Sequence, residues 1–290
     1  MFSAEEILQY LEGKEDDINP MLTFPATGYF NNNTFFGGNF MAFQPNNKLS
    51  IEAWVYYTGT SGFGLPGICE RVFIPDQPSN LHGWGLSTVQ IGSIERVDFQ
   101  INAGNQRLIV QSLTTNSIRF NEPTQIIVSY KGDRNATNTK IYINGEPSTQ
   151  VMINNLPTNN IAYTAFGLPS TFQIGRRRVA TFPEVNGFNF QRPMGKLTLW
   201  DAALTDQDAA VLYNDGRGLD LESNFMYNDK IMGAWNFGRV WDFFGTGSHV
   251  LASAKYSRAR DWNGAGGFMV AGNIDRTNNF PPREFISRFE

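Results

Sequence analysis

The chain has 290 residues, 41% of them hydrophobic and only 17% charged, a composition typical of a folded protein and not of a disordered one. Its formal net charge of −4 argues against a general nucleic-acid binder and against a protein that binds anionic membranes. The single cysteine, Cys69, excludes an intrachain disulfide, and two histidines cannot supply a histidine-rich metal site. Because no apolar run approaches about 18 residues, we expect no membrane-spanning helix.

The N-terminal residues predict one short helix. Ser3 is a suitable N-cap, Glu6 completes a capping box, and Ile7 and Leu11 lie on one apolar stripe. A helix of this length is marginally stable alone, so we expect it to dock on its own domain or on a partner. The same segment lacks the basic and apolar regions of a secretory signal, and we therefore expect synthesis in the cytosol without an export signal.

From about Pro20 onward, apolar residues alternate with polar ones in short runs bounded by Gly, Asn, Pro or Asp. Many short strands and almost no helix predict an all-β fold, a two-sheet antiparallel sandwich. One internal helix is expected after Thr205, with Asp206 and Asp208 in its first turn and Gly216 beyond its end. The predicted strands are 49–58, 84–92, 96–102, 106–113, 125–132, 140–145, 172–177 and 196–200.

The C-terminal part of the chain divides into two. Its aromatic residues between Trp235 and Phe244 are too dense for a solvated tail, which indicates that this stretch returns to the sandwich. We therefore expect an N-terminal helix and linker at 1–19, a β-sandwich at 20–250 and a C-terminal arm at 251–290.

Three blocks of sequence carry a resemblance. They are 49–55 (LSIEAWV), the pair 125–132 (QIIVSYKG) and 140–145 (KIYING), and 172–175 (FQIG) with 195–214 (GKLTLWDAALTDQDAAVLYN). In this order they resemble the laminin-G-like modules of the concanavalin A-like lectin and glucanase superfamily, over about residues 20–250. The resemblance implies a two-sheet jelly roll. Many members bind glycans or protein partners, often with calcium, and some are glycosidases.

Glycoside hydrolysis requires two carboxylates that flank the scissile bond. Retaining members of the superfamily carry them on one strand as E-x-D-x-E, and no strand here has that pattern. Glu95 and Asp98 are three positions apart and so face opposite sides of their strand, while Glu52 and Glu70 are isolated. We therefore expect no catalytic residues and a protein that is not an enzyme, with a hydrolase whose acids come from distant strands as the alternative.

One loop is a candidate site for calcium as a cofactor. Asp133, Asn135 and Asn138 place several hard oxygens at the tip of the hairpin that resembles the family. Asp and Asn are also the residues that polar turns favour, so a simple turn explains the same residues without a metal.

Four residues are candidates for ligand binding. Trp84 and Phe188 lie beside glycines, where exposed rings could stack on a sugar, although a core or interface role is the default for a single aromatic residue. Arg176 and Arg178 belong to a basic run that could meet an anionic partner or a sulfated sugar, and a solvated strand end is the alternative.

Modules that resemble laminin-G generally work outside cells, whereas this sequence shows no export signal. A virion protein, made in the cytosol and released by lysis, reconciles the two. We therefore expect a structural or binding protein of a bacteriophage virion (capsid decoration, fibre or tail), docked through its N-terminal helix and C-terminal arm. It would form a homo-oligomer and contact host-surface glycans, with no nucleic-acid or membrane partner. The alternative is a lectin-like module outside a virion and, less favoured, a glycoside hydrolase.

Overall fold

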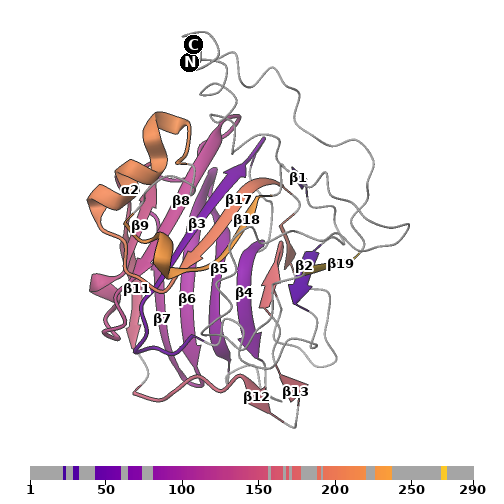
Figure 1. Cartoon of the computed structure of the whole chain (residues 1–290), viewed down its shortest axis with the longest axis vertical. Coiled ribbons are helices and arrows are strands. Elements are labelled where there is room, and N and C mark those ends of the chain that lie inside the picture. The colour runs from indigo at the N-terminus through magenta and orange to yellow at the C-terminus, as the bar shows by residue number, and fades with distance from the viewer. Residues whose placement is uncertain are drawn as a thin grey trace, which may run out of the picture.

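Alternating apolar side chains give the chain two antiparallel sheets stacked face to face (Figure 1). Within the described residues nearly all regular structure is strand, with one short α-helix, which confirms the predicted all-β sandwich; its architecture is that of a jelly roll. The computed structural model describes residues 22–23, 29–32, 43–59, 65–73, 81–155, 158–165, 168–169, 172–177, 188–190, 192–219, 226–236 and 269–272.

The first sheet has seven strands in the order β1, β17, β3, β8, β9, β10, with β18 also paired to β17. Their bounds are β1 Leu22–Thr23, β3 Leu49–Tyr56, β8 Pro123–Tyr130, β9 Lys140–Ile143, β10 Glu146–Pro147, β17 Pro193–Trp200 and β18 Ile231–Asn236.

The second sheet has eight strands in the order β11, β7, β6, β5, β4, β14, β2, β19. Their bounds are β2 Tyr29–Asn32, β4 Gly67–Phe73, β5 His82–Ile91, β6 Ile94–Ala103, β7 Gln106–Gln111, β11 Gln150–Asn155, β14 Phe172–Ile174 and β19 Met269–Gly272.

Smaller elements complete the described chain. Two short ladders pair β12 with β13 and β15 with β16. The bounds are β12 Thr164–Ala165, β13 Leu168–Pro169, β15 Arg176–Arg177, β16 Phe188–Asn189, α2 Asp206–Tyr213, and the 3₁₀ turns η2 Ala136–Asn138, η3 Asn214–Gly216 and η4 Asn228–Lys230.

The main core fills the space between the two sheets. Ile51, Ala53 and Val55 of β3 all point inward, as their alternation predicts, and each is fully buried. Facing strands contribute Phe99 of β6 and Leu86 of β5 in the same way. Burying one such large apolar side chain stabilises the fold by about 1.5–3 kcal/mol, so this alternation is the main driving force for the sandwich.

The helix α2 begins as the sequence predicts and ends earlier. Thr205 and Asp208 form a reciprocal capping box, in which the Asp208 carboxylate accepts from the Thr205 N–H at 2.8 Å. The last helical residue is Tyr213, and the C-cap is Asn214, which adopts the left-handed conformation at φ 47° in place of the glycine that the sequence predicts, Gly216. Figure 1 shows α2 lying against the outer face of the seven-stranded sheet, where Tyr213 stacks on Trp54 at 6.0 Å between ring centroids.

A second apolar cluster joins α2 to that outer face. The seven-stranded sheet is therefore buried on both sides where α2 covers it. The cluster consists of Ile127, Tyr142, Trp200, Ala202, Leu204, Ala209, Leu212 and Ile231.

The structure describes only four residues of the two terminal segments that the sequence predicts outside the sandwich. Residues 269–272, inside the expected C-terminal arm, form β19 and pair with β2 at the edge of the eight-stranded sheet. The predicted N-terminal helix at 1–19 and the rest of the arm at 251–290 lie outside the described residues.

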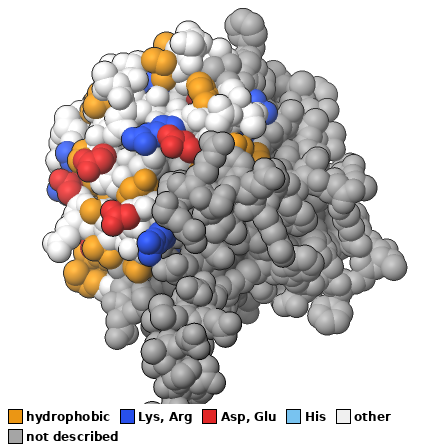
Figure 2. All heavy atoms as spheres, turned by 90° about the horizontal axis from the view of Figure 1, so that it is seen from above, with side chains coloured by type: hydrophobic (Ala, Val, Ile, Leu, Met, Phe, Trp, Pro, Cys, Tyr) orange, Lys and Arg blue, Asp and Glu red, His pale blue; other side chains and the backbone are white. Residues whose placement is uncertain are grey.

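The described surface mixes charges of both signs. Figure 2 shows basic and acidic side chains close together on the face seen from above, with hydrophobic groups scattered between them. Arg119 pairs with Glu122 at 3.6 Å and Lys230 with Asp229 at 3.4 Å. Exposed pairs of this kind contribute little to stability. In the part of the chain that the structure describes, no helix is long and apolar enough to cross a membrane.

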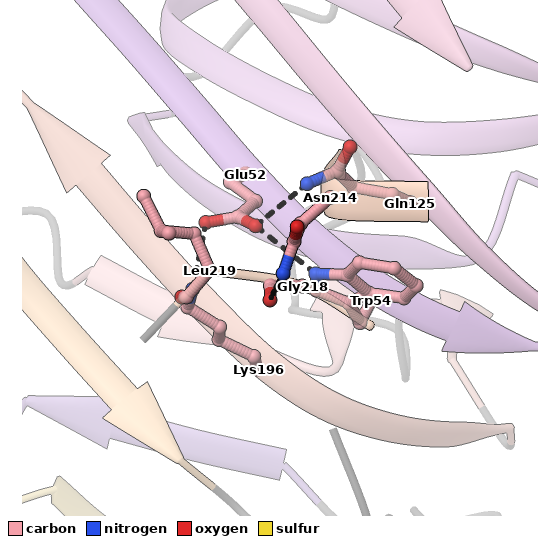
Figure 3. A network of polar contacts seen from close by, with 7 residues as sticks. All are labelled: Glu52, Trp54, Gln125, Lys196, Asn214, Gly218 and Leu219. Carbon is pink, nitrogen blue, oxygen red and sulfur yellow. Dashed lines mark hydrogen bonds and ion pairs between the residues drawn. The ribbon is translucent and has the colours of Figure 1, made fainter. Parts of the chain in front are cut away.

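A buried charge pair ties the segment after α2 to the seven-stranded sheet (Figure 3). Glu52 accepts hydrogen bonds from the Trp54 indole at 3.0 Å and the Gln125 amide at 2.8 Å, and its second oxygen lies 3.2 Å from Lys196 Nζ. Lys196 Nζ also donates to the Leu219 carbonyl at 3.0 Å. The network thus links β3, β8 and β17 to the residues that follow the helix.

The Glu52→Gln substitution should destabilise the protein by about 3–5 kcal/mol, because it leaves the buried Lys196 ammonium without its counter-ion. Lys196→Met should cost a similar amount, and the double variant Glu52→Gln/Lys196→Met should lose clearly less than the sum of the two. Urea denaturation of the three variants measures this coupling. Strictly additive losses would show that the pair does not act as a unit.

An irregular segment at 158–163 is held by side chains from distant parts of the chain, one from the loop before β3 and one from the start of β5. The Gln44 amide donates to the Ile161 carbonyl at 3.1 Å and accepts from the Ile161 N–H at 2.8 Å. The Ala162 N–H donates to His82 Nδ1 at 3.3 Å. This acceptor exists only while His82 is neutral, so its protonation state bears on how firmly the segment is held.

Burial lowers the pKa of His82 below 6.5, so between the two pKa values the unfolded chain binds a proton that the folded chain does not. The free energy of unfolding should therefore be highest above about pH 6.5 and decrease as the pH falls toward the folded pKa. His82→Gln keeps an acceptor without a titrating group and should flatten this dependence. Urea denaturation in a His249→Gln background isolates His82, and identical pH profiles with and without His82 would contradict the linkage.

Candidate functional site

The outer face of the eight-stranded sheet carries a row of polar side chains. In β6, Val97, Phe99 and Ile101 point into the core, which places Asp98 and Gln100 on the opposite face. On the neighbouring strand β7, Gln111 lies opposite Asp98 and Ile109 lies opposite Gln100. We call Asp98, Gln100, Asn102 and Gln111 the polar strip.

Asp98 organises the polar strip. Its Oδ1 accepts from the Gln111 amide at 2.8 Å and its Oδ2 from the Gln100 amide at 2.8 Å. The Asn102 amide donates to Gln100 Oε1 at 3.4 Å, which extends the chain of contacts along β6. Hydrogen bonds to a carboxylate are stronger than those between neutral groups, so Asp98 fixes the orientation of both glutamine amides.

The charge of Asp98 is compensated inside the sheet. Arg96 lies two positions away on the same face of β6 and donates to the Ser112 carbonyl at 2.5 Å and to Gln150 Oε1 at 2.7 Å. Burial lowers the pKa of Arg96, and the negative charge of Asp98 acts in the opposite direction. The two groups therefore balance each other at the base of the strip.

Exposure increases across this face toward the β11 edge. Asp98 and Asn102 are only 4% and 3% exposed, whereas Gln100 and Gln111 are half-buried. Ile109 of β7 and Ile153 of β11 pair across the strands and are also half-buried. The accessible part of the face therefore combines amide groups held by Asp98 with a small apolar platform.

Two glycines shape the floor beside the strip. Gly85 pairs with Gln100 on one side and Glu70 on the other, and a Cβ at this position would lie 3.3 Å from Glu70 Cβ. Gly83 has φ +132°, and a Cβ there would lie 2.0 Å from the Arg71 carbonyl, so only glycine fits. Glu70 is on the same outer face as Asp98, with β5 between their strands, and it is buried.

The structure corrects the prediction for Trp84. The ring is fully buried between the sheets, with its centroid 5.8 Å from that of Phe172. Trp84 and Leu86 share the inward face of β5, so the indole fills the core and is not available to stack on a sugar.

The other three ligand-binding candidates fall partly within the described chain. β15 pairs with β16, so that Arg176 lies opposite Asn189 and Arg177 opposite Phe188. The structure thus brings the basic run beside the loop that contains Phe188, which the sequence did not show. Arg178 lies outside the described residues, and a binding role for Arg176, Arg178 and Phe188 stays a prediction.

The loop proposed for calcium is held together by its own hydrogen bonds. Asp133 accepts from the Asn138 amide at 2.6 Å and from the Asn135 N–H at 3.1 Å, and Asn135 Oδ1 caps η2 through the Thr137 N–H at 3.0 Å. These contacts are those of a polar turn. Among the described residues, no three His, Cys, Asp or Glu side chains gather in a way that could hold a metal ion. Calcium at Asp133, Asn135 and Asn138 stays a prediction that the turn does not require.

No family model matches the chain, and no curated protein matches it. Among solved structures, the chain is similar to a heptameric SAP-like pentraxin from Limulus polyphemus, at TM-score 0.46 and 15% identity over 68% of this chain and 83% of that one.

Two bacterial structures are also similar. One is a putative carbohydrate binding protein from Bacteroides ovatus, at TM-score 0.49 and 15% identity, and this match covers 88% of the chain but 59% of that protein. The other is the CBM40 module of the Ruminococcus gnavus IT-sialidase bound to α2,3-sialyllactose, at TM-score 0.43 and 12% identity over 67% of this chain and 97% of that one.

Proposed function

We propose that this chain is a non-enzymatic carbohydrate-binding module that holds a glycan on the polar strip. The observation that carries the proposal is that Asp98 accepts hydrogen bonds from the amides of Gln100 and Gln111. These bonds orient the two amides on rigid strands. Groups held in place before binding lose little conformational entropy when the ligand arrives.

The composition of the strip suits a sugar. A sugar ring presents hydroxyl groups at its edge and C–H groups on its faces, so it requires both polar partners and an apolar surface. The amide of Gln100 can donate to and accept from hydroxyl groups, whereas Gln111 can offer only its amide N–H, because its Oε1 is buried. Ile109, paired with Ile153, offers the apolar surface beside them. Binding sites commonly combine a few placed polar groups with apolar surface in this way.

The surroundings of Asp98, the acid of the polar strip, suit a protein that binds a glycan without hydrolysing it. A glycosidase uses one carboxyl as an acid and a second as a base or nucleophile on the other side of the bond. Both oxygens of Asp98 are occupied by amide donors, and the carboxyl is buried beneath them. Asp98 therefore orients the amides that flank it. Hydrolysis is the alternative, and the binding test described next can detect it.

Asp98→Ala should release both amides and lower glycan affinity about tenfold or more, since about 1.4 kcal/mol corresponds to a factor of ten. Gln100→Ala, at a half-buried position, should lower affinity with little loss of stability. A glycan array followed by titration calorimetry measures the effect, and chromatography of the incubated glycan detects hydrolysis.

Asp229→Ala is the matched control, because it removes an exposed acid from the turn before β18 of the seven-stranded sheet and should leave affinity unchanged. Wild-type affinity in both strip variants, or equal losses in strip and control variants, would contradict the assignment of this face. Cleavage of the glycan would contradict a non-enzymatic binding module and support the alternative, a glycoside hydrolase.

We further propose that the module works in a virion, docked through its N-terminal helix and C-terminal arm and self-associated. The support is the sequence: the resemblance to modules that work outside cells, and the capping box at Ser3 and Glu6, which predicts a helix too short to be stable alone.

Gradient-purified phage particles should contain the chain by mass spectrometry, in a fixed ratio to the other virion proteins. A variant without residues 1–19 should still bind glycan but be missing from particles. Normal incorporation of that variant would refute the docking role of the helix, and absence of the full chain from particles would refute the virion setting.

A further inference from the structure

An exposed arginine borders the polar strip and has no partner of opposite charge among the residues that the structure describes. Arg107 lies on β7 in one cross-strand row with Asn102 of β6 and Asn155 of β11. Its side chain is exposed and makes no hydrogen bond or ion pair with the described residues. Arg119, equally a surface arginine, is instead paired with Glu122 at 3.6 Å.

The local charge balance singles out Arg107. Arg96 and Asp98 compensate each other at the base of the strip. Arg107 therefore adds an exposed positive charge that neither of them balances, in a chain whose net charge is −4. Glu70, the other acid of this face, is buried on β4, with β5 and β6 between it and β7. On the face that Figure 2 shows, basic and acidic side chains lie close together and do not form a general basic surface.

We infer that the ligand of the polar strip is an acidic saccharide whose carboxylate or sulfate group pairs with Arg107. This inference rests on the proposed function and names its ligand class. The planar guanidinium presents its donors in a fork that matches the oxygens of a carboxylate or sulfate, with two parallel hydrogen bonds. Asn155 is exposed in the same row, about 4.8 Å away across the sheet, and supplies a further amide donor.

The spacing along β7 indicates an oligosaccharide. Arg107, Ile109 and Gln111 alternate onto the outer face, and the four residue-to-residue steps from Arg107 to Gln111 span about 13.6 Å in an extended strand. That length exceeds one sugar ring. The acidic group lies at the Arg107 end, the C–H face of a ring packs on Ile109, and the hydroxyl groups of the next ring meet Gln111 and Gln100.

Titration calorimetry with matched ligand pairs tests the inference. The probes are trigalacturonate, 3′-sialyllactose and a chondroitin sulfate hexasaccharide, each against its methyl ester or desulfated counterpart. At least one acidic probe should bind about tenfold tighter than its uncharged counterpart, because a hydrogen bond between charged groups is stronger than one between neutral groups. Raised salt should reduce this preference. Whether the carboxylate or the sulfate pair shows it identifies the anion.

Arg107→Ala should abolish the preference for the acidic form, and Arg107→Lys should retain part of it, since lysine keeps the charge and lacks the fork. Arg119→Ala is the matched control and should keep the preference intact. Equal binding of the acidic and uncharged forms by the wild-type protein would overturn the inference. A preference that survives Arg107→Ala would do the same.

The inference and the proposed function can fail separately. If only neutral glycans bind, and Asp98→Ala weakens them, the acidic ligand is wrong and the polar strip stands. If no saccharide on the array binds, both fail.

Discussion

Burial of one face of the central strands between the two sheets determines what the opposite face can present. In β6 the inward positions are taken by Val97, Phe99 and Ile101, so the residues between them must face outward. The strands are also held at fixed spacing by their ladders. Side chains on neighbouring strands, such as Asp98 and Gln111, therefore meet in a geometry that the apolar core sets and that no loop has to maintain.

The two outer faces of the sandwich differ in what covers them. On the seven-stranded sheet, α2 and its apolar cluster cover the face, and Glu52 with Lys196 fastens the segment that follows the helix. On the eight-stranded sheet, the face over β6 and β7 keeps a network of amides around Asp98, and exposure rises toward Arg107. One face is thus covered by the helix, and the other is the face on which we propose that a ligand binds.

The sequence predicted elements whose causes are local. The strand alternation around Ile51 and the N-cap at Thr205 are properties of a few adjacent residues, and the structure has both. Trp84 was misjudged because the glycines beside it suggested a loop, although its shared parity with Leu86 already indicated the inward face. The alternation that marks Val97 and Phe99 as core also marks Asp98 and Gln100 as outward, a signal present in the sequence but not used.

By itself the sequence determined that the chain forms an antiparallel two-sheet sandwich, because strand period and turn residues act over short distances. Only the tertiary structure decided that Gln111 would meet Asp98, that Arg107 would stand beside Asn155, and that Glu52 would be sealed under the segment after α2. These contacts join residues that are far apart along the chain. They depend on strand order and register, which the cooperative packing of the whole core selects and no single segment specifies.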